Sequence, residues 1–286
     1  MPTFFGKLLR VASPPIWKLL LGMMVGWMGS PQAWADVLVR AEIASTTGSV
    51  RIGSSTAAEI TDTTGKKYSD LPAMKAIWAT PQRQGIVLNG LVAPVLRIKP
   101  TGDGLVAVNN RWYAGEVILM GRNQILAVNY VNIEDYVASV VEAEMGSSFS
   151  PEALKAQAIA ARSYVLYHRN SRPWFDVHSD TRSQVYRGVN HSPAVLAATE
   201  ATKGIVMVYG GEFVNAMYSS SSGGQTVGVQ GIPYLRSVPD ITNRPKFGHG
   251  IGMSQWGAEA RARQDWNYRQ ILGYYYRGVS LGRLPE

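Results

Sequence analysis

The stretch from Asn132 to Arg169 constrains the fold of this chain most, because it carries the start and stop signals of two successive helices. Asn132 is a residue type whose side chain caps a helix, and Gly146 is the type that ends one in the left-handed conformation. Ser150 followed by Pro151 combines a capping residue with a proline at the first helical position. The sequence therefore predicts two helices joined by a short turn.

One acidic residue of the first helix lies in line with apolar ones. The helical spacing i, i+4, i+7, i+8, i+11 places on one face the residues Ile133, Val137, Val140, Val141 and Glu144. A carboxyl held against apolar surface has a raised pKa, so it can donate a proton at neutral pH. The alternative is that Glu144 reaches solvent at the helix end and caps the next helix. The pattern alone favours this alternative, since most surface acids have no special role.

The first 35 residues have the features of an export signal. Three positive charges, Lys7, Arg10 and Lys18, precede an apolar run from Leu19 to Met28, and Ala33-Trp34-Ala35 follows as a small-x-small cleavage site. We predict removal after Ala35 and a location in the periplasm or cell wall. An uncleaved anchor is the alternative, disfavoured because the run is short. The sequence predicts no membrane span after cleavage.

Charge and composition limit the classes of molecule that this protein is expected to bind. The chain of 286 residues has 28 Lys and Arg against 20 Asp and Glu, a net charge of +8, and no cysteine. Loss of residues 1–35 would remove three positive charges and no negative ones, leaving +5. This basic excess is spread rather than clustered, which argues against a nucleic-acid partner and favours an anionic polymer of the cell envelope. Without cysteine there are no disulfides and no thiolate sites.

The region before residue 130 is rich in short β-segments bounded by turn residues. Candidate strands lie at 37–43, 86–88, 95–98, 105–108, 116–119 and 125–128, with turns at 101–104 and 121–124. The Ser-, Thr- and Gly-rich residues 45–67 are expected to be loop and weak strand. No catalytic constellation occurs here, so this region is predicted to be a scaffold or a binding platform.

The region after residue 150 mixes helices and strands. Lys155, Arg162 and Arg169 recur at heptad spacing, which favours a solvated face and leaves open a row facing an anionic ligand. We expect a helix over 193–203, a strand pair over 205–209 and 212–218 around Gly210-Gly211, and a final helix over 258–276 with a break near Asp265.

Three polar clusters in this region are ambiguous on their own. Asp176, His178 and Asp180 are too few to define a metal site, and turn formation explains them equally well. The serines and glycines of 219–224 are either a flexible loop or a row that hydrogen-bonds a polar ligand, and no G-x-S-x-G elbow is present. The four glycines of 247–258 do not match a dinucleotide-binding fingerprint.

Taken together, the motifs resemble the SpoIID/LytB family of cell-wall proteins, the sporulation stage II protein D and amidase-enhancer group. The resemblance runs from Tyr130 to about Leu281 through VNIEDYVASVVEAEM, SPEALKAQAIAARSYVLY, FDVHSDTRSQVYRG, ATKGIVMVYGGEFVNAMYSSSSGGQT, PYLRSV and GHGIGMSQWGA. It implies an α+β fold, in which a β-rich N-terminal region packs with a helical and antiparallel-sheet catalytic core. We therefore expect a signal peptide at 1–35, the β-rich region at 36–129 and a SpoIID-like core at 130–286.

The resemblance also implies an activity, that of a peptidoglycan lytic transglycosylase with Glu144 as catalytic acid/base. Most glycoside hydrolases use two carboxylates, whereas here the 6-hydroxyl of the sugar attacks the anomeric carbon and one carboxyl suffices. The residues expected to hold the glycan strand are Lys155, Gln157, Arg162, Gln184, Tyr186, Ser220, Ser221, Ser222, His249, Gln255 and Trp256. Of these, Tyr186 or Trp256 would be the sugar platform.

Three departures from the family pattern bear on these expectations. Gly146 replaces the usual proline after the Glu-Met pair, and with no Cys beside the serine-glycine run we expect neither zinc nor another cofactor. The interval from Pro239 to Phe247 is much shorter than in most members, so a wall of the groove is expected to be missing. The alternative function is therefore a non-catalytic glycan-binding protein that enhances a cell-wall amidase.

Two further possibilities carry less weight. An esterase would use Ser222 and His249 as nucleophile and base. Hydrolysis in place of transglycosylation would need a second carboxylate, for which Asp176 and Asp180 are the candidates.

Overall fold

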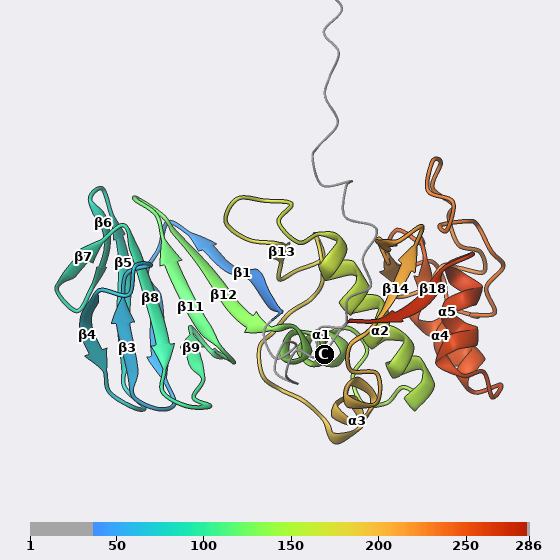
Figure 1. The fold of residues 1–286 in the computed structure, drawn as a ribbon, viewed down its shortest axis with the longest axis horizontal. Helices are drawn as coiled ribbons and strands as arrows, with labels where there is room; N and C mark the ends of the chain where they lie inside the picture. Colours follow the sequence, from blue (N-terminus) through green and yellow to red (C-terminus); the bar gives the residue numbers. More distant parts are fainter. Residues whose placement is uncertain (1–36, 285–286) are drawn as a thin grey trace, which may run out of the picture.

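The computed structural model describes residues 37–284 and has a mixed α+β fold (Figure 1). The predicted export signal at 1–35 lies outside the described residues. Within 37–284, twelve strands precede the first helix, and the chain passes from strand to helix at Asn132 and Ile133. No helix in this part of the chain is long and apolar enough to cross a membrane.

The β-rich part consists of two antiparallel sheets that pack face to face (Figure 1). One sheet has the order β13-β1-β12-β11-β8-β3-β4, in which β13 pairs with β1 in parallel. Its strands are β1 (Leu38–Thr46), β3 (Ala58–Thr61), β4 (Lys67–Leu71), β8 (Val95–Pro100), β11 (Glu116–Met120), β12 (Ile125–Asn132) and β13 (Val177–His178). The other sheet, of order β10-β9-β2-β5-β6-β7, contains β2 (Val50–Ser54), β5 (Ala76–Gln82), β6 (Gly85–Leu88), β7 (Leu91–Ala93), β9 (Val106–Val108) and β10 (Arg111–Tyr113).

Residues 45–67, predicted to be loop and weak strand, contain loops and also supply the core strands β2 and β3. Val50, Ile52, Ala58 and Ile60 are each at most 1% exposed and face the space between the sheets. Polar residues between them, such as Arg51 and Glu59, face outward. The period of two was present in the sequence but was obscured by the Ser, Thr and Gly around it.

The helical part is organised around α2 (Pro151–Tyr167), which packs against the other helices: α1 (Ile133–Glu144), α3 (Pro193–Ala201), α4 (Gln255–Ala262) and α5 (Tyr268–Tyr275). The predicted caps of α1 are confirmed, since the Asn132 side chain accepts from the amide of Glu134 and Gly146 has φ of 72°. The break near Asp265 is also confirmed, and it divides the last helical stretch into α4 and α5. Ser150 precedes α2 but makes no capping hydrogen bond.

Two small sheets complete the helical part. The strand predicted for 212–218 extends only over β15 (Glu212–Phe213), and β14 (Ile205–Tyr209) pairs on its other side with β18 (Ser280–Arg283). The short strands β16 (Tyr218–Ser219) and β17 (Met253–Ser254) pair in parallel. This pairing brings the serine-glycine run beside the start of α4, although more than 30 residues separate them in the sequence.

Candidate active site

Glu144 is the last residue of α1, and its carboxyl is held by donors from three separate segments. The backbone amide of Val185 donates to Oε1 at 2.8 Å. Two longer contacts, each 3.4 Å, come from the Tyr218 hydroxyl to Oε1 and from Gln255 Nε2 to Oε2. The loop before α3, strand β16 and helix α4 therefore converge on one carboxyl group.

Burial raises the pKa of Glu144 above the usual value for a glutamate. The hydrogen bonds from Val185, Gln255 and Tyr218, and the positive charge of Arg187, lower the pKa but do not cancel the effect of burial. Glu144 is partly exposed, but the alternative in which it caps the next helix was wrong. That place is taken by Glu259, whose carboxylate accepts from the amide of Ser150 at 2.7 Å and from its hydroxyl at 3.0 Å.

Behind the first contacts, Gln184 orients the Tyr218 hydroxyl. Gln184 is fully buried; its Oε1 accepts from Tyr136 at 3.1 Å and its Nε2 donates to the oxygen of Tyr218 at 3.0 Å. Because Gln184 donates to the Tyr218 oxygen, the Tyr218 proton is free to point at Glu144. Gln184 therefore orients Tyr218 and does not contact a ligand itself. Tyr218 lies beside the carboxyl of Glu144 but was not among the predicted site residues.

The serine run is a fixed turn rather than a flexible loop. Ser222 is buried and donates to Asp240 at 2.6 Å, and the Ser221 hydroxyl donates to the carbonyl of Arg244 at 3.3 Å. Ser220 is partly exposed, and its carbonyl accepts from the amide of Trp256. Only Ser220 of the three is therefore placed to meet a ligand.

Asp240 anchors the short interval between Pro239 and Phe247 to the core. Its Oδ1 accepts from Arg261 at 2.9 Å and from Tyr275 at 2.7 Å. Burial opposes ionisation of Asp240, but the donors Ser222, Tyr275 and Arg261 hold its pKa below the usual value. The interval is short, yet both of its ends are tied, since Phe247 exchanges two backbone hydrogen bonds with Ser221.

Trp256 and His249 flank the same region at the surface. The Arg244 guanidinium lies over the Trp256 ring at 3.5 Å, and the Phe149 ring is 4.7 Å from it. His249 is exposed at the surface, and its Nδ1 accepts from the amide of Ile251. Desolvation of the imidazole by neighbouring atoms, together with the charge of Lys246, lowers its pKa. The Ser222 hydroxyl donates to Asp240 instead of to His249, so these two do not form a nucleophile-base pair.

Three of the predicted glycan contacts are buried and were wrong. Arg162 and Gln157 are fully buried and Tyr186 is 1% exposed, so none can reach a strand at the surface. Arg162 pairs with Glu134 at 2.5 Å, and the Tyr186 hydroxyl donates to Asn129 at 2.7 Å. Lys155 is partly exposed and forms an ion pair with Glu152 at 2.6 Å, so its glycan contact stays a prediction.

Gln157 differs from the other buried residues because its side-chain amide has no hydrogen-bond partner in the described part of the chain. It lies one helical turn before Ala161, whose carbonyl accepts from Gln184 at 3.4 Å. A buried amide in this condition is usually matched by a water molecule.

The acids of 176–180 are occupied in ion pairs. Asp176 is 1% exposed and binds Arg40 at 2.7 Å, while Arg182 binds Asp180 at 2.7 Å and lowers its pKa to about 2. His178 instead lies 3.0 Å from Glu42. Among residues 37–284 no group of three His, Cys, Asp or Glu side chains is placed to hold a metal ion.

Comparison with known proteins identifies the family. The model of the SpoIID family, described as stage II sporulation protein, matches residues 121–209. Stage II sporulation protein D of Bacillus subtilis is 34% identical over 259 residues, a match that covers 54% of this chain and 76% of that protein. This chain belongs to the SpoIID/LytB family. The family match includes Glu144, Val185 and Gln184 but ends before Tyr218 and Gln255.

Other relatives extend the comparison. An uncharacterised protein of Brachyspira hyodysenteriae is 27% identical over 276 residues, covering 63% of this chain and 75% of that protein. The amidase enhancer of Bacillus subtilis is 38% identical over 121 residues, which is 41% of this SpoIID-family chain and only 16% of the enhancer.

Proposed function

We propose that this protein is an exported lytic transglycosylase that cleaves the MurNAc-GlcNAc bond of peptidoglycan and forms 1,6-anhydroMurNAc. Membership in the SpoIID family supports a function related to the cell wall. The observation that carries the finer proposal is the single carboxyl of Glu144, with its raised pKa and three converging donors. The substrate would be glycan strands already stripped of peptides by an amidase.

In the proposed reaction Glu144 serves first as acid and then as base. Its protonated carboxyl gives a proton to the glycosidic oxygen as the bond from that oxygen to the anomeric carbon breaks. The 6-hydroxyl oxygen of the same MurNAc bonds to the anomeric carbon, and its proton passes to Glu144. Val185, Tyr218 and Gln255 would stabilise the carboxylate that exists between the two proton transfers.

The environment of the other acids favours a one-carboxyl mechanism over hydrolysis. A second catalytic carboxylate must be free to act on water or on the sugar. Asp176 is buried in its ion pair with Arg40, and Asp180 is held by Arg182. Neither candidate is free in this sense.

Digestion of purified peptide-free glycan strands, with product analysis by mass spectrometry, tests the proposal. We expect anhydro ends from the wild type and none from Glu144→Gln. Glu142→Gln is the matched control, because Glu142 is on the same helix but accepts from the amide of Ser192. Absence of anhydro ends from the wild type would refute the activity; cleavage by Glu144→Gln would refute only the assignment of Glu144. Reducing ends would indicate hydrolysis.

The second candidate is a glycan-binding protein that stimulates an amidase without cutting glycan. It is favoured by the 38% identity to the amidase enhancer over 121 residues. Addition of the Glu144→Gln variant to an N-acetylmuramoyl-L-alanine amidase on intact peptidoglycan separates the two. Undiminished stimulation of peptide release by this variant would support the enhancer function.

Export is part of the proposal and has its own test. We expect the protein recovered outside the cytoplasm to begin at Asp36. An N-terminus at Met1 on recovered protein would contradict cleavage after Ala35.

A further inference from the structure

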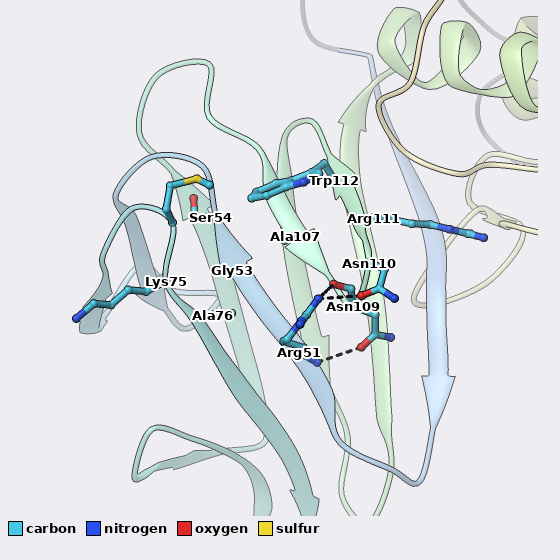
Figure 2. Close-up of a pocket in the computed structure, with 11 residues that line it drawn as sticks. Arg51, Gly53, Ser54, Lys75, Ala76, Ala107, Asn109, Asn110, Arg111 and Trp112 are labelled. Atoms are coloured by element: carbon cyan, nitrogen blue, oxygen red, sulfur yellow. Dashed lines mark hydrogen bonds between the residues drawn. The ribbon is translucent and has the colours of Figure 1, made fainter.

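The outer face of the sheet that contains β2, β5, β9 and β10 holds an open groove of about 310 Å³ (Figure 2). Arg51, Asn109 and Asn110 form one end, and Figure 2 shows the Trp112 ring at the other. Arg51 is fixed there, because its guanidinium donates to Asn110 Oδ1 at 2.8 Å and to the carbonyl of Asn109 at 3.2 Å.

The strand register explains why the groove exists. Trp112 pairs with Ala107, Ala107 with Gly53, and Gly53 with Ala76, so these four residues form one row across four strands. Paired residues point to the same face, so a row with one large and three small side chains leaves a trough beside the indole. A Cβ on Gly53 would lie 3.2 Å from the carbonyl oxygen of Lys75, a tight contact, so glycine keeps this part of the floor low.

The groove is rimmed by exposed side chains that a soluble surface usually hides. Trp112 is 36% exposed and Met74 is 73% exposed. Trp78, directly opposite Arg51 in the β2-β5 register, is 60% exposed and therefore on the same face. Met74 also has φ of 57°, a conformation rare for a residue other than glycine, and its amide is bonded to the carbonyl of Ser54. Strained backbone beside exposed aromatics is typical of a binding surface.

The charge of the groove selects the ligand class. The charged residues that line it are Arg51, Lys75 and Arg111, all positive, and its amides are those of Asn109 and Asn110. Arg111 pairs with the buried Val108, so its side chain leaves on the other face of β10 (Figure 2) and only its backbone borders the groove. Cations bind anions, amides bind hydroxyls, and an indole face stacks on an apolar ring face. Together these groups match a chain of sugar rings that carries carboxylates.

The groove is also linked to Glu144 through a short stretch of chain. The carbonyl of Trp112 accepts from the amide of Val189 at 2.8 Å. Val189 is four residues beyond Val185, whose amide holds the Glu144 carboxyl. Four residues span at most about 14 Å, so the indole end of the groove lies within reach of a ligand several sugars long.

We propose that this groove is a distal binding site for the carboxylate-bearing glycan strand, with Trp112 as sugar platform, Arg51 as carboxylate contact and Lys75 as a positive charge at the edge. The choice of this glycan rests on the proposed function. The β-rich part then retains a strand whose other end lies at Glu144. It also supplies the aromatic platform that Tyr186, buried in the core, cannot provide.

Binding to the exported chain carrying Glu144→Gln tests the inference, because this variant should hold strands without cutting them. Affinity is measured by calorimetry for peptide-free glycan strands and for neutral N-acetylglucosamine oligomers of the same length. Trp112→Ala and Lys75→Glu are expected to weaken binding of the anionic strands about tenfold each. Binding should also weaken as salt is raised.

Matched controls and a check on folding keep the result interpretable. Trp174→Ala removes an indole that is 61% exposed outside the groove, and Lys203→Glu reverses a charge on a side chain that is 59% exposed. Both should bind strands like the parent protein, and all variants should melt within a few degrees of it. Groove variants that bind like these controls would overturn the inference, as would equal affinity for neutral oligomers or a preference for a single-stranded oligonucleotide.

The inference and the proposed function fail separately. Wild-type protein that releases no anhydro ends refutes the transglycosylase, whereas binding that is lost on Trp112→Ala still supports the groove. Conversely, normal anhydro products with unchanged binding by the groove variants refute the groove alone.

Discussion

Replacement of Arg162 by methionine should destabilise the fold rather than weaken ligand binding directly. Arg162 is fully buried on α2; its Nε and Nη2 donate to Glu134 at 3.0 and 2.5 Å, and its Nη1 donates to the carbonyl of Ile205 at 3.0 Å. Methionine fills a similar volume but supplies none of these hydrogen bonds. The Arg162→Met variant therefore leaves a carboxylate and a carbonyl without their partner.

The magnitude follows from what is left unpaired. Removing one partner of a buried ion pair costs about 3–5 kcal/mol. The Glu134 side chain is 23% exposed and keeps a hydrogen bond from the amide of Gly204 at 3.1 Å, which favours the lower end of that range. The orphaned carbonyl of Ile205 adds about 1 kcal/mol, so we expect a loss of roughly 4 kcal/mol. For a chain of this size the melting temperature should fall by roughly 10 °C.

Urea unfolding followed by circular dichroism measures this loss. Arg169→Met is the matched control, because Arg169 is exposed at the end of the same basic row and should change stability by less than about 0.5 kcal/mol. Adding Glu134→Gln to Arg162→Met should recover part of the loss, since it removes the unpaired charge. If Arg162→Met is as stable as Arg169→Met and instead binds glycan less tightly, Arg162 contacts the ligand and the reasoning from burial is refuted.

Three more predictions concern Glu144 and the segment that holds it. Tyr218→Phe removes a hydrogen-bond donor that lowers the pKa of Glu144, so this pKa should rise. The alkaline limb of the pH-rate profile should then move to higher pH. An alkaline limb at the wild-type pH would show that the 3.4 Å contact has no effect. Because the pKa of Glu144 is raised in the folded state, its contribution to stability is present while it is protonated and is lost as pH rises through that pKa. Glu144→Gln should therefore gain stability relative to wild type as pH increases. A difference in urea unfolding that does not depend on pH would contradict this prediction. In Gly188→Ala the new Cβ would collide with the carbonyl oxygen of Trp112, and residue 188 has φ of 77°, which alanine rarely adopts. The free energy of unfolding should therefore fall by at least about 2 kcal/mol, and glycan cleavage should weaken as well. A variant that melts and cleaves like the wild type would refute this prediction.

Local signals in the sequence were enough to predict where α1 begins and ends, where α2 begins, and that Glu144 shares a face of α1 with apolar residues. Asn132, Gly146 and Pro151 act through the backbone of their own neighbours, so their effect does not depend on the rest of the fold. The line of apolar residues that ends in Glu144 likewise reports which face of α1 is buried. The raised pKa of Glu144 follows from that placement.

The partners of the acid could not be predicted in the same way, because they depend on contacts between distant segments. Tyr218 and Gln255 reach Glu144 only because β16 pairs in parallel with β17, a pairing of two residues that leaves no periodic pattern. The role of Arg162 was missed for a related reason. Heptad spacing indicates that residues share a face of a helix, but Glu134 on the neighbouring helix determines that Arg162 is buried.

Residues 185–189 contact both the β-rich part and the proposed catalytic carboxyl, so the two parts are structurally coupled. The amide of Val185 holds Glu144, and the Tyr186 hydroxyl donates to Asn129, a buried residue of β12. Gly188 then lies against Trp112, whose carbonyl accepts from Val189. Within five residues, one contact is with the helical core and the next three are with β-strands. A ligand that orders the groove at Trp112 would therefore also restrict the segment that sets the position and pKa of Glu144.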